Sequence, residues 1–106
     1  MKVLLDECVP LQVRNALTGH EVATAQQMGW GGMTNGELLK AAEAVGFQVF
    51  ILADKNMRYQ QNLAGRQIAI LELWTNHRPT LEKYFPAIRK AVETIAAGAY
   101  LELSSP

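Results

Sequence analysis

The chain has 106 residues, 49% of them hydrophobic, and its ten basic residues balance ten acidic ones. This length suits a single domain over residues 1–106 with a packed core, and the neutral charge neither indicates nor excludes a nucleic-acid partner. No apolar run approaches the ~20 residues that span a bilayer, so we expect no membrane anchor. Because the first expected strand begins at Lys2 and Cys8 is the one cysteine, we expect no signal peptide, no internal disulfide and a cytoplasmic location.

The apolar runs and the turn residues between them predict strands that alternate with helices. The expected strands cover residues 2–5, 21–25, 48–53, 67–73 and 100–103. The expected helices lie between Pro10 and Gly19, Thr34 and Gly46, Asp54 and Ala64, and Thr80 and Ile95. This order predicts an α/β fold, a three-layer sandwich with right-handed crossovers. Its sheet should be mostly parallel, with four or five strands in the order 2-1-3-4-5.

Two of the expected helices carry specific boundary signals. Thr34 and Glu37 have the spacing of a capping box, with Thr34 as the N-cap and Glu37 at the third helical position. Gly46 is placed to end that helix. Pro86 falls inside the apolar pattern of the last helix, so we expect a kink there or a short helix before a longer one.

Two of the expected strands run directly into a carboxylate. Asp6 and Glu7 follow residues 2–5, and Asp54 follows residues 48–53. These strands are neighbours in the predicted order, and the carboxyl ends of parallel strands meet at one edge of a sheet, so Asp6 and Asp54 should meet there. At ~4 Å and an effective dielectric of about 20, two such charges repel by roughly 4 kcal/mol. A hard divalent cation with oxygen ligands is the natural partner for such a pair.

Simpler interpretations of the same acids stay open. Asp54 can serve only as an N-cap, a role that aspartate fills well. Asp6 can be a turn residue ahead of Pro10, and Glu7 a solvated side chain. The capping box by itself gives Glu37 a complete structural role.

Three runs of the sequence together resemble one family: Lys2-Val-Leu-Leu-Asp-Glu-Cys-Val-Pro10, Asn35-Gly-Glu-Leu-Leu39 and Leu52-Ala-Asp-Lys-Asn-Met57. They look like the compact PIN-like domains, small relatives of the metal-dependent PIN ribonucleases. Many of these domains are toxins of bacterial toxin–antitoxin pairs. The resemblance covers roughly residues 1–95 and implies a PIN-like fold, an RNA substrate and an antitoxin protein as a partner.

Carried over by position, the resemblance makes Asp6 and Asp54 the ligands of a Mg²⁺ or Mn²⁺ ion. Many family members have acids where this chain has Asn35 and Asn56. An amide oxygen can ligate Mg²⁺ or orient a bound water, but it brings no charge. The resemblance therefore implies weak binding of one ion and weak hydrolysis. In that reaction Glu7 or Glu37 would orient the attacking water, and Asn56 would hydrogen-bond to it.

Basic residues follow the expected site along the chain. Lys55 and Arg58, with Arg66 beyond them, can steer phosphates towards it. Exposed helix charges of this kind are also common without any specific role. Trp30 and Trp74 can stack on bases or pack over the ends of the sheet.

Two other functions fit parts of the same pattern. A phosphoacceptor receiver module also has acids after strand one, an aspartate after strand three, Mg²⁺ and a 2-1-3-4-5 sheet. Receivers place a lysine at the end of strand five, whereas residues 100–103 end without one. The third interpretation is a PIN-like domain without catalysis that binds a partner or forms a homodimer, which the amides Asn35 and Asn56 favour.

Overall fold

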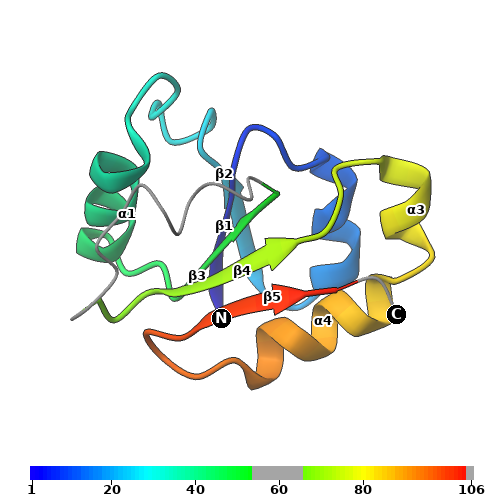
Figure 1. The fold of residues 1–106 in the computed structure, drawn as a ribbon. Helices are drawn as coiled ribbons and strands as arrows, with labels where there is room; N and C mark the ends of the chain where they lie inside the picture. Colours follow the sequence, from blue (N-terminus) through cyan, green and yellow to red (C-terminus); the bar gives the residue numbers. More distant parts are fainter. Residues whose placement is uncertain (54–65, 105–106) are drawn as a thin grey trace.

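The computed structural model describes residues 1–53 and 66–104 (Figure 1). Its strands are β1 (Lys2–Leu5), β2 (Glu21–Thr24), β3 (Val49–Leu52), β4 (Ala69–Leu73) and β5 (Tyr100–Leu103). Its helices are the 3-10 helix η1 (Leu11–Leu17) and the α-helices α1 (Asn35–Ala44), α3 (Arg78–Glu82) and α4 (Phe85–Thr94). The helix expected between Asp54 and Ala64 lies outside the described residues.

All five strands form one parallel sheet in the order β2-β1-β3-β4-β5. This confirms the predicted α/β class and strand order. Every residue of β3 and β4 is buried, as expected for continuous apolar strands that are covered on both faces. The edge strands β2 and β5 are more exposed. Strand β1 lies between β2 and β3, so residues that follow it emerge near the middle of the sheet.

Two apolar cores lie on the two faces of the sheet. Alternate residues of each strand point to opposite faces, so Leu5 joins one core and Leu4 the other. The first core packs the sheet against η1, α3 and α4, and the second packs it against α1. Figure 1 shows α1 on one side of the strands and η1, α3 and α4 on the other. The sheet with its two layers of helices is the predicted three-layer sandwich.

The connection from β4 to β5 has the opposite hand to the connection from β2 to β3. Both advance across the sheet in the direction of β5, but α1 lies on one face, whereas α3 and α4 lie on the other. With β2–α1–β3 in the usual right-handed sense, β4–α3–α4–β5 is left-handed. The expectation of right-handed crossovers throughout was therefore wrong. The physical reason is packing, since Leu81, Ile88 and Val92 are fully buried in the core that η1 also covers.

The helix boundaries follow the signals in the sequence. Thr34 is the N-cap of α1, and its hydroxyl oxygen accepts a hydrogen bond from the Glu37 N–H at 3.3 Å. Gly46, with φ of +90°, follows the end of α1. Pro86 lies in the first turn of α4, after the short helix α3, so the predicted division of this segment is confirmed. Helix η1 has 3-10 geometry, with the Val13 N–H bonded to the Pro10 carbonyl oxygen at 3.0 Å.

Candidate functional site

Asp6 lies directly after the interior strand β1, at the carboxyl edge of the sheet. Its N–H donates to the Ile51 carbonyl oxygen of β3 at 2.9 Å, and its own carbonyl accepts from the Val9 N–H at 3.1 Å. On the other side of the strand, the Ala25 N–H donates to the Leu5 carbonyl oxygen at 2.9 Å. These bonds to both neighbouring strands fix the backbone from which the Asp6 carboxylate projects.

The Asp6 side chain is half-buried, and one donor among the described residues reaches it. The Cys8 thiol donates a hydrogen bond to Asp6 Oδ2 at 2.8 Å. A thiol is a weak donor, so it orients the carboxylate without neutralising its charge. Asp6 Oδ1 makes no hydrogen bond to any residue in the described part of the chain. The Cys8 thiol therefore orients one oxygen of this carboxylate.

The Asp6 carboxylate lines a cleft of about 390 Å³ at the carboxyl edge of the sheet. The cleft lies between the segment that follows β1 and the segment that follows β2. It is lined by Asp6, Glu7, Val9, Pro10, Leu11, Thr24, Gln26 and Gln27. The crevice outside the carboxyl ends of the strands is where open parallel sheets bind ligands. Two acids and two side-chain amides make this cleft polar, whereas Val9, Pro10 and Leu11 give it an apolar side.

The glycine-rich loop over residues 28–33 meets Glu7. A Cβ atom at Gly31 would lie only 3.1 Å from Glu7 Oε1, so the carboxylate rests almost against the backbone of the loop. Trp30 anchors this loop by packing edge-on against Phe47, with ring centroids 6.0 Å apart. Trp74 packs in the same way on Tyr84 at 5.4 Å. Of the two roles considered for the tryptophans, the structure therefore shows packing.

A turn after β2 forms the other wall of the cleft. The Thr24 N–H donates to Gln27 Oε1 at 2.9 Å, and the Gln27 N–H donates to Thr24 Oγ1 at 3.0 Å. These reciprocal bonds hold the Gln27 side chain in place. Sequence reasoning did not single out Thr24, Gln26 or Gln27. These residues could have been found from the predicted strand order, which places the carboxyl end of β2 beside that of β1.

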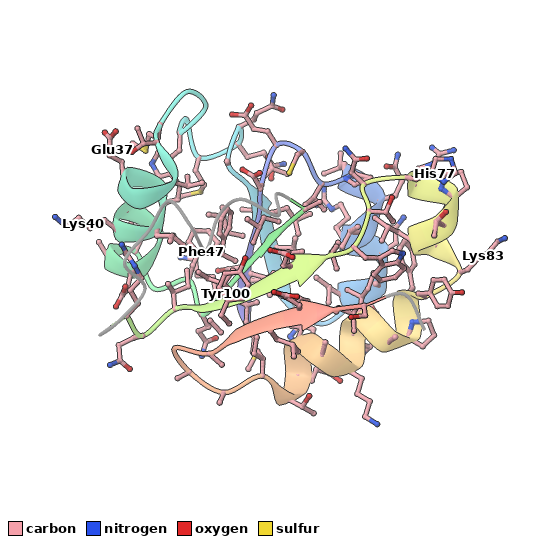
Figure 2. The ribbon with its side chains drawn as sticks, viewed as in Figure 1. Glu37, Lys40, Phe47, His77, Lys83 and Tyr100 are labelled. Carbon is pink, nitrogen blue, oxygen red and sulfur yellow. The ribbon has the colours of Figure 1, made fainter. Side chains whose placement is uncertain are left out.

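Glu37 does not line the cleft. It lies in the first turn of α1 and projects outward from it, as Figure 2 shows. The Thr34 hydroxyl donates to Glu37 Oε1 at 2.8 Å, so the capping interaction engages this carboxylate. The catalytic role predicted for Glu37 stays a prediction. The predicted residues Asp54, Lys55, Asn56 and Arg58 lie outside the described residues.

Arg66 lies at the other edge of the sheet. It precedes β4, and the Gly98 N–H beside it donates to the Gln67 carbonyl oxygen at 2.8 Å. This is the amino edge of the strands, whereas the cleft is at their carboxyl edge. The suggestion that Arg66 steers phosphates to the Asp6 site is therefore corrected.

A separate charged cluster ties α4 to the chain around η1. His20 Nε2 lies 2.9 Å from Glu93 Oε2, and Arg89 Nε lies 3.3 Å from the same oxygen. Arg89 Nη1 also donates to the Thr18 carbonyl oxygen at 2.7 Å, just beyond the end of η1. The hydrogen bond from His20, with the positive charge of Arg89, lowers the pKa of Glu93 below its ordinary value of 4.5. This cluster lines no part of the Asp6 cleft.

The donor atoms around Asp6 suit a hard cation. The carboxylates of Asp6 and Glu7 and the Thr24 hydroxyl are oxygen donors, which Mg²⁺ and Mn²⁺ prefer. Among residues 1–53 and 66–104, no three His, Cys, Asp or Glu side chains are grouped as they would be around a metal ion. The acids that line the cleft in the described part of the chain are Asp6 and Glu7.

Comparisons with protein-family models, with curated proteins and with solved structures found no match. In the described part of the chain, no helix is both long and apolar enough to cross a membrane.

Proposed function

We propose that this chain is a metal-dependent phosphodiesterase of the PIN-like type that hydrolyses RNA, with Asp6 at the centre of its site. The observation that carries the proposal is the Asp6 carboxylate itself. It projects from the end of the interior strand β1 into a polar cleft, with one oxygen oriented by Cys8. A hard divalent cation with oxygen ligands is the natural partner for this carboxylate and the neighbouring Glu7.

Asp6 and Asp54 would hold the Mg²⁺ or Mn²⁺ ion. Asp54 follows Ala53 in the sequence, and β3 pairs with β1 so that Leu5 is opposite Ile51. The ends of these two strands thus share the edge at which Asp6 projects, which supports the proposal of Asp54 as the second ligand. The bound ion would polarise the phosphodiester and lower the pKa of a water for in-line attack.

The protein residues have separate roles in this proposal. Glu7, held beside the loop at Gly31, accepts a hydrogen bond from the attacking water and so orients it. Glu37 and Asn56 are further candidates for contacts with this water. Lys55 and Arg58 would attract the phosphates of the substrate.

The choice of RNA as the substrate rests on the resemblance to PIN-like domains. An antitoxin protein, a second copy of the chain and a cytoplasmic location belong to the same proposal.

The Asp6→Asn variant tests the role of the carboxylate. Asparagine keeps the shape of the side chain and can still accept the Cys8 hydrogen bond, so the fold should persist. We expect the loss of Mn²⁺-dependent cleavage of single-stranded RNA, and weaker Mn²⁺ binding by calorimetry, because one anionic ligand is lost. Glu21→Gln is the matched control, because Glu21 is an exposed acid at the amino end of β2.

Unchanged cleavage and unchanged Mn²⁺ affinity in Asp6→Asn would refute the proposal. Two tight Mn²⁺ sites in the wild-type protein would contradict the expectation of a single weak site. Incubation with acetyl phosphate and Mg²⁺ separates the enzyme from the receiver. Labelling of Asp54, together with no RNA cleavage by purified protein, would favour the receiver instead.

A further inference from the structure

The turn between Thr24 and Gln27 fixes which end of the Gln27 amide faces Thr24. A backbone N–H can only donate, so the atom that meets the Thr24 N–H at 2.9 Å must be the amide oxygen of Gln27. The side-chain NH₂ group therefore points away from Thr24. This group makes no hydrogen bond to any residue that the structure describes. Gln27 thus places a hydrogen-bond donor of defined orientation on a wall of the Asp6 cleft.

We propose that Gln27 is a substrate-binding residue, whose side-chain NH₂ donates to a non-bridging phosphate oxygen of the RNA. The inference rests on the proposed function. It adds to that function a neutral hydrogen-bond donor that contacts the phosphate. The acids Asp6 and Glu7 can only accept hydrogen bonds and repel a phosphate, even where a cation offsets part of their charge. A hydrogen-bond donor on the opposite wall offsets this repulsion, because it bonds to the phosphate oxygens.

Gln27 differs from the other donors of the cleft in its preorganisation. Gln26 also lines the cleft, but its side chain makes no hydrogen bond to a described residue, so binding would have to order it. The side chain of Gln27 is already held by Thr24, so little rotamer entropy is lost when it contacts a ligand. The contact with Thr24 also has a structural effect, because it satisfies the last N–H of the edge strand β2.

The same geometry indicates a phosphate contact rather than recognition of a base. A glutamine reads adenine through both its amide oxygen and its amide nitrogen. The oxygen of Gln27 is engaged by the Thr24 N–H, so only the amide nitrogen, which is a donor and cannot accept, is available. One donor matches an anionic oxygen, and contacts to phosphate are independent of sequence. We therefore expect Gln27 to increase the affinity for RNA of any sequence.

The Gln27→Glu variant separates the substrate contact from the structural role. A glutamate can still accept the Thr24 N–H, so the turn is kept, but the donor becomes an acceptor that repels phosphate. Gln26→Glu is the matched control, because it introduces the same charge into the same cleft without removing an oriented donor. The probes are short single-stranded oligo(A) and oligo(U), with affinity measured by fluorescence anisotropy in Mn²⁺. KM and kcat are then measured for cleavage of the same RNAs.

For Gln27→Glu we expect a loss of affinity and a rise in KM of about tenfold or more, which is typical of a lost hydrogen bond to a charged group. The changes should be equal for both RNAs, kcat should stay within about twofold and Mn²⁺ affinity should not fall. In Gln26→Glu we expect a change below about threefold. Equal effects in the two variants, or an effect confined to oligo(A), would overturn the proposal. If wild-type protein binds but does not cleave RNA, the proposed hydrolysis fails, while the anisotropy comparison still decides the role of Gln27.

Discussion

Replacing Gly98 by alanine should destabilise the fold by about 2–5 kcal/mol, through two effects that the structure separates. Gly98 has a φ of +75°, in the left-handed region where a Cβ atom costs about 1–2 kcal/mol. In addition, the new Cβ would lie 2.6 Å from the Arg66 carbonyl oxygen. A backbone atom cannot rotate away as a side chain can, so the segment before β4 would have to shift. Crowding of this kind typically costs a further 1–3 kcal/mol or so.

Gly46→Ala is the matched control for this prediction. Gly46 has a φ of +90°, but an added Cβ would have no heavy atom within 4 Å. Alanine there carries the backbone cost alone, about 1–2 kcal/mol. The difference between the two variants therefore isolates the contact with Arg66. In the native turn ahead of β5, the Gly98 N–H donates to the Gln67 carbonyl oxygen at 2.8 Å.

Urea unfolding followed by circular dichroism measures both free energies, and thermal melts give an independent check. For a chain of this size, 1 kcal/mol corresponds to about 4 °C in Tm. We expect Tm to fall by about 8–20 °C in Gly98→Ala and by about 4–8 °C in Gly46→Ala. Equal losses of stability in the two variants would refute the reasoning, because the close approach to the Arg66 carbonyl would then carry no energetic cost.

Two further substitutions test the loop at the site and the pH dependence. Gly31→Ala should leave Tm within about 3 °C, because Gly31 has no positive φ and the added Cβ meets only the flexible end of Glu7. RNA cleavage in Mn²⁺ should nevertheless slow, because Glu7 is displaced from the position in which it would orient the attacking water. An unchanged cleavage rate would remove Glu7 from the site. The lowered pKa of Glu93 gives stability that is present above pH 4.5 and is lost as the pH falls below that value. His20→Ala should therefore flatten the acid side of the stability–pH curve, whereas His77→Ala should not, and parallel curves for the two variants would contradict the role of His20.

The sequence by itself determined the strands and their order. The runs at residues 2–5 and 48–53 are apolar enough to predict buried parallel strands, and the α/β alternation then limits the strand order to few possibilities. Thr34 and Pro86 mark the start of α1 and the division between α3 and α4, because capping and the missing proline N–H act within one helical turn. The position of Asp6 at the carboxyl edge follows from the same local reasoning.

Only the tertiary structure decided which distant groups meet. The face on which α3 and α4 pack depends on the fit of their apolar residues with η1, and no local signal reports that fit. The same holds for the buried carboxylate of Glu72, which accepts a hydrogen bond from the Tyr100 hydroxyl of the neighbouring strand. At the site, the sequence indicated the acid of Asp6, but it could not show the oriented amide of Gln27 across the cleft. That amide depends on the path of the chain after β2, which is set by hydrogen bonds and packing in three dimensions.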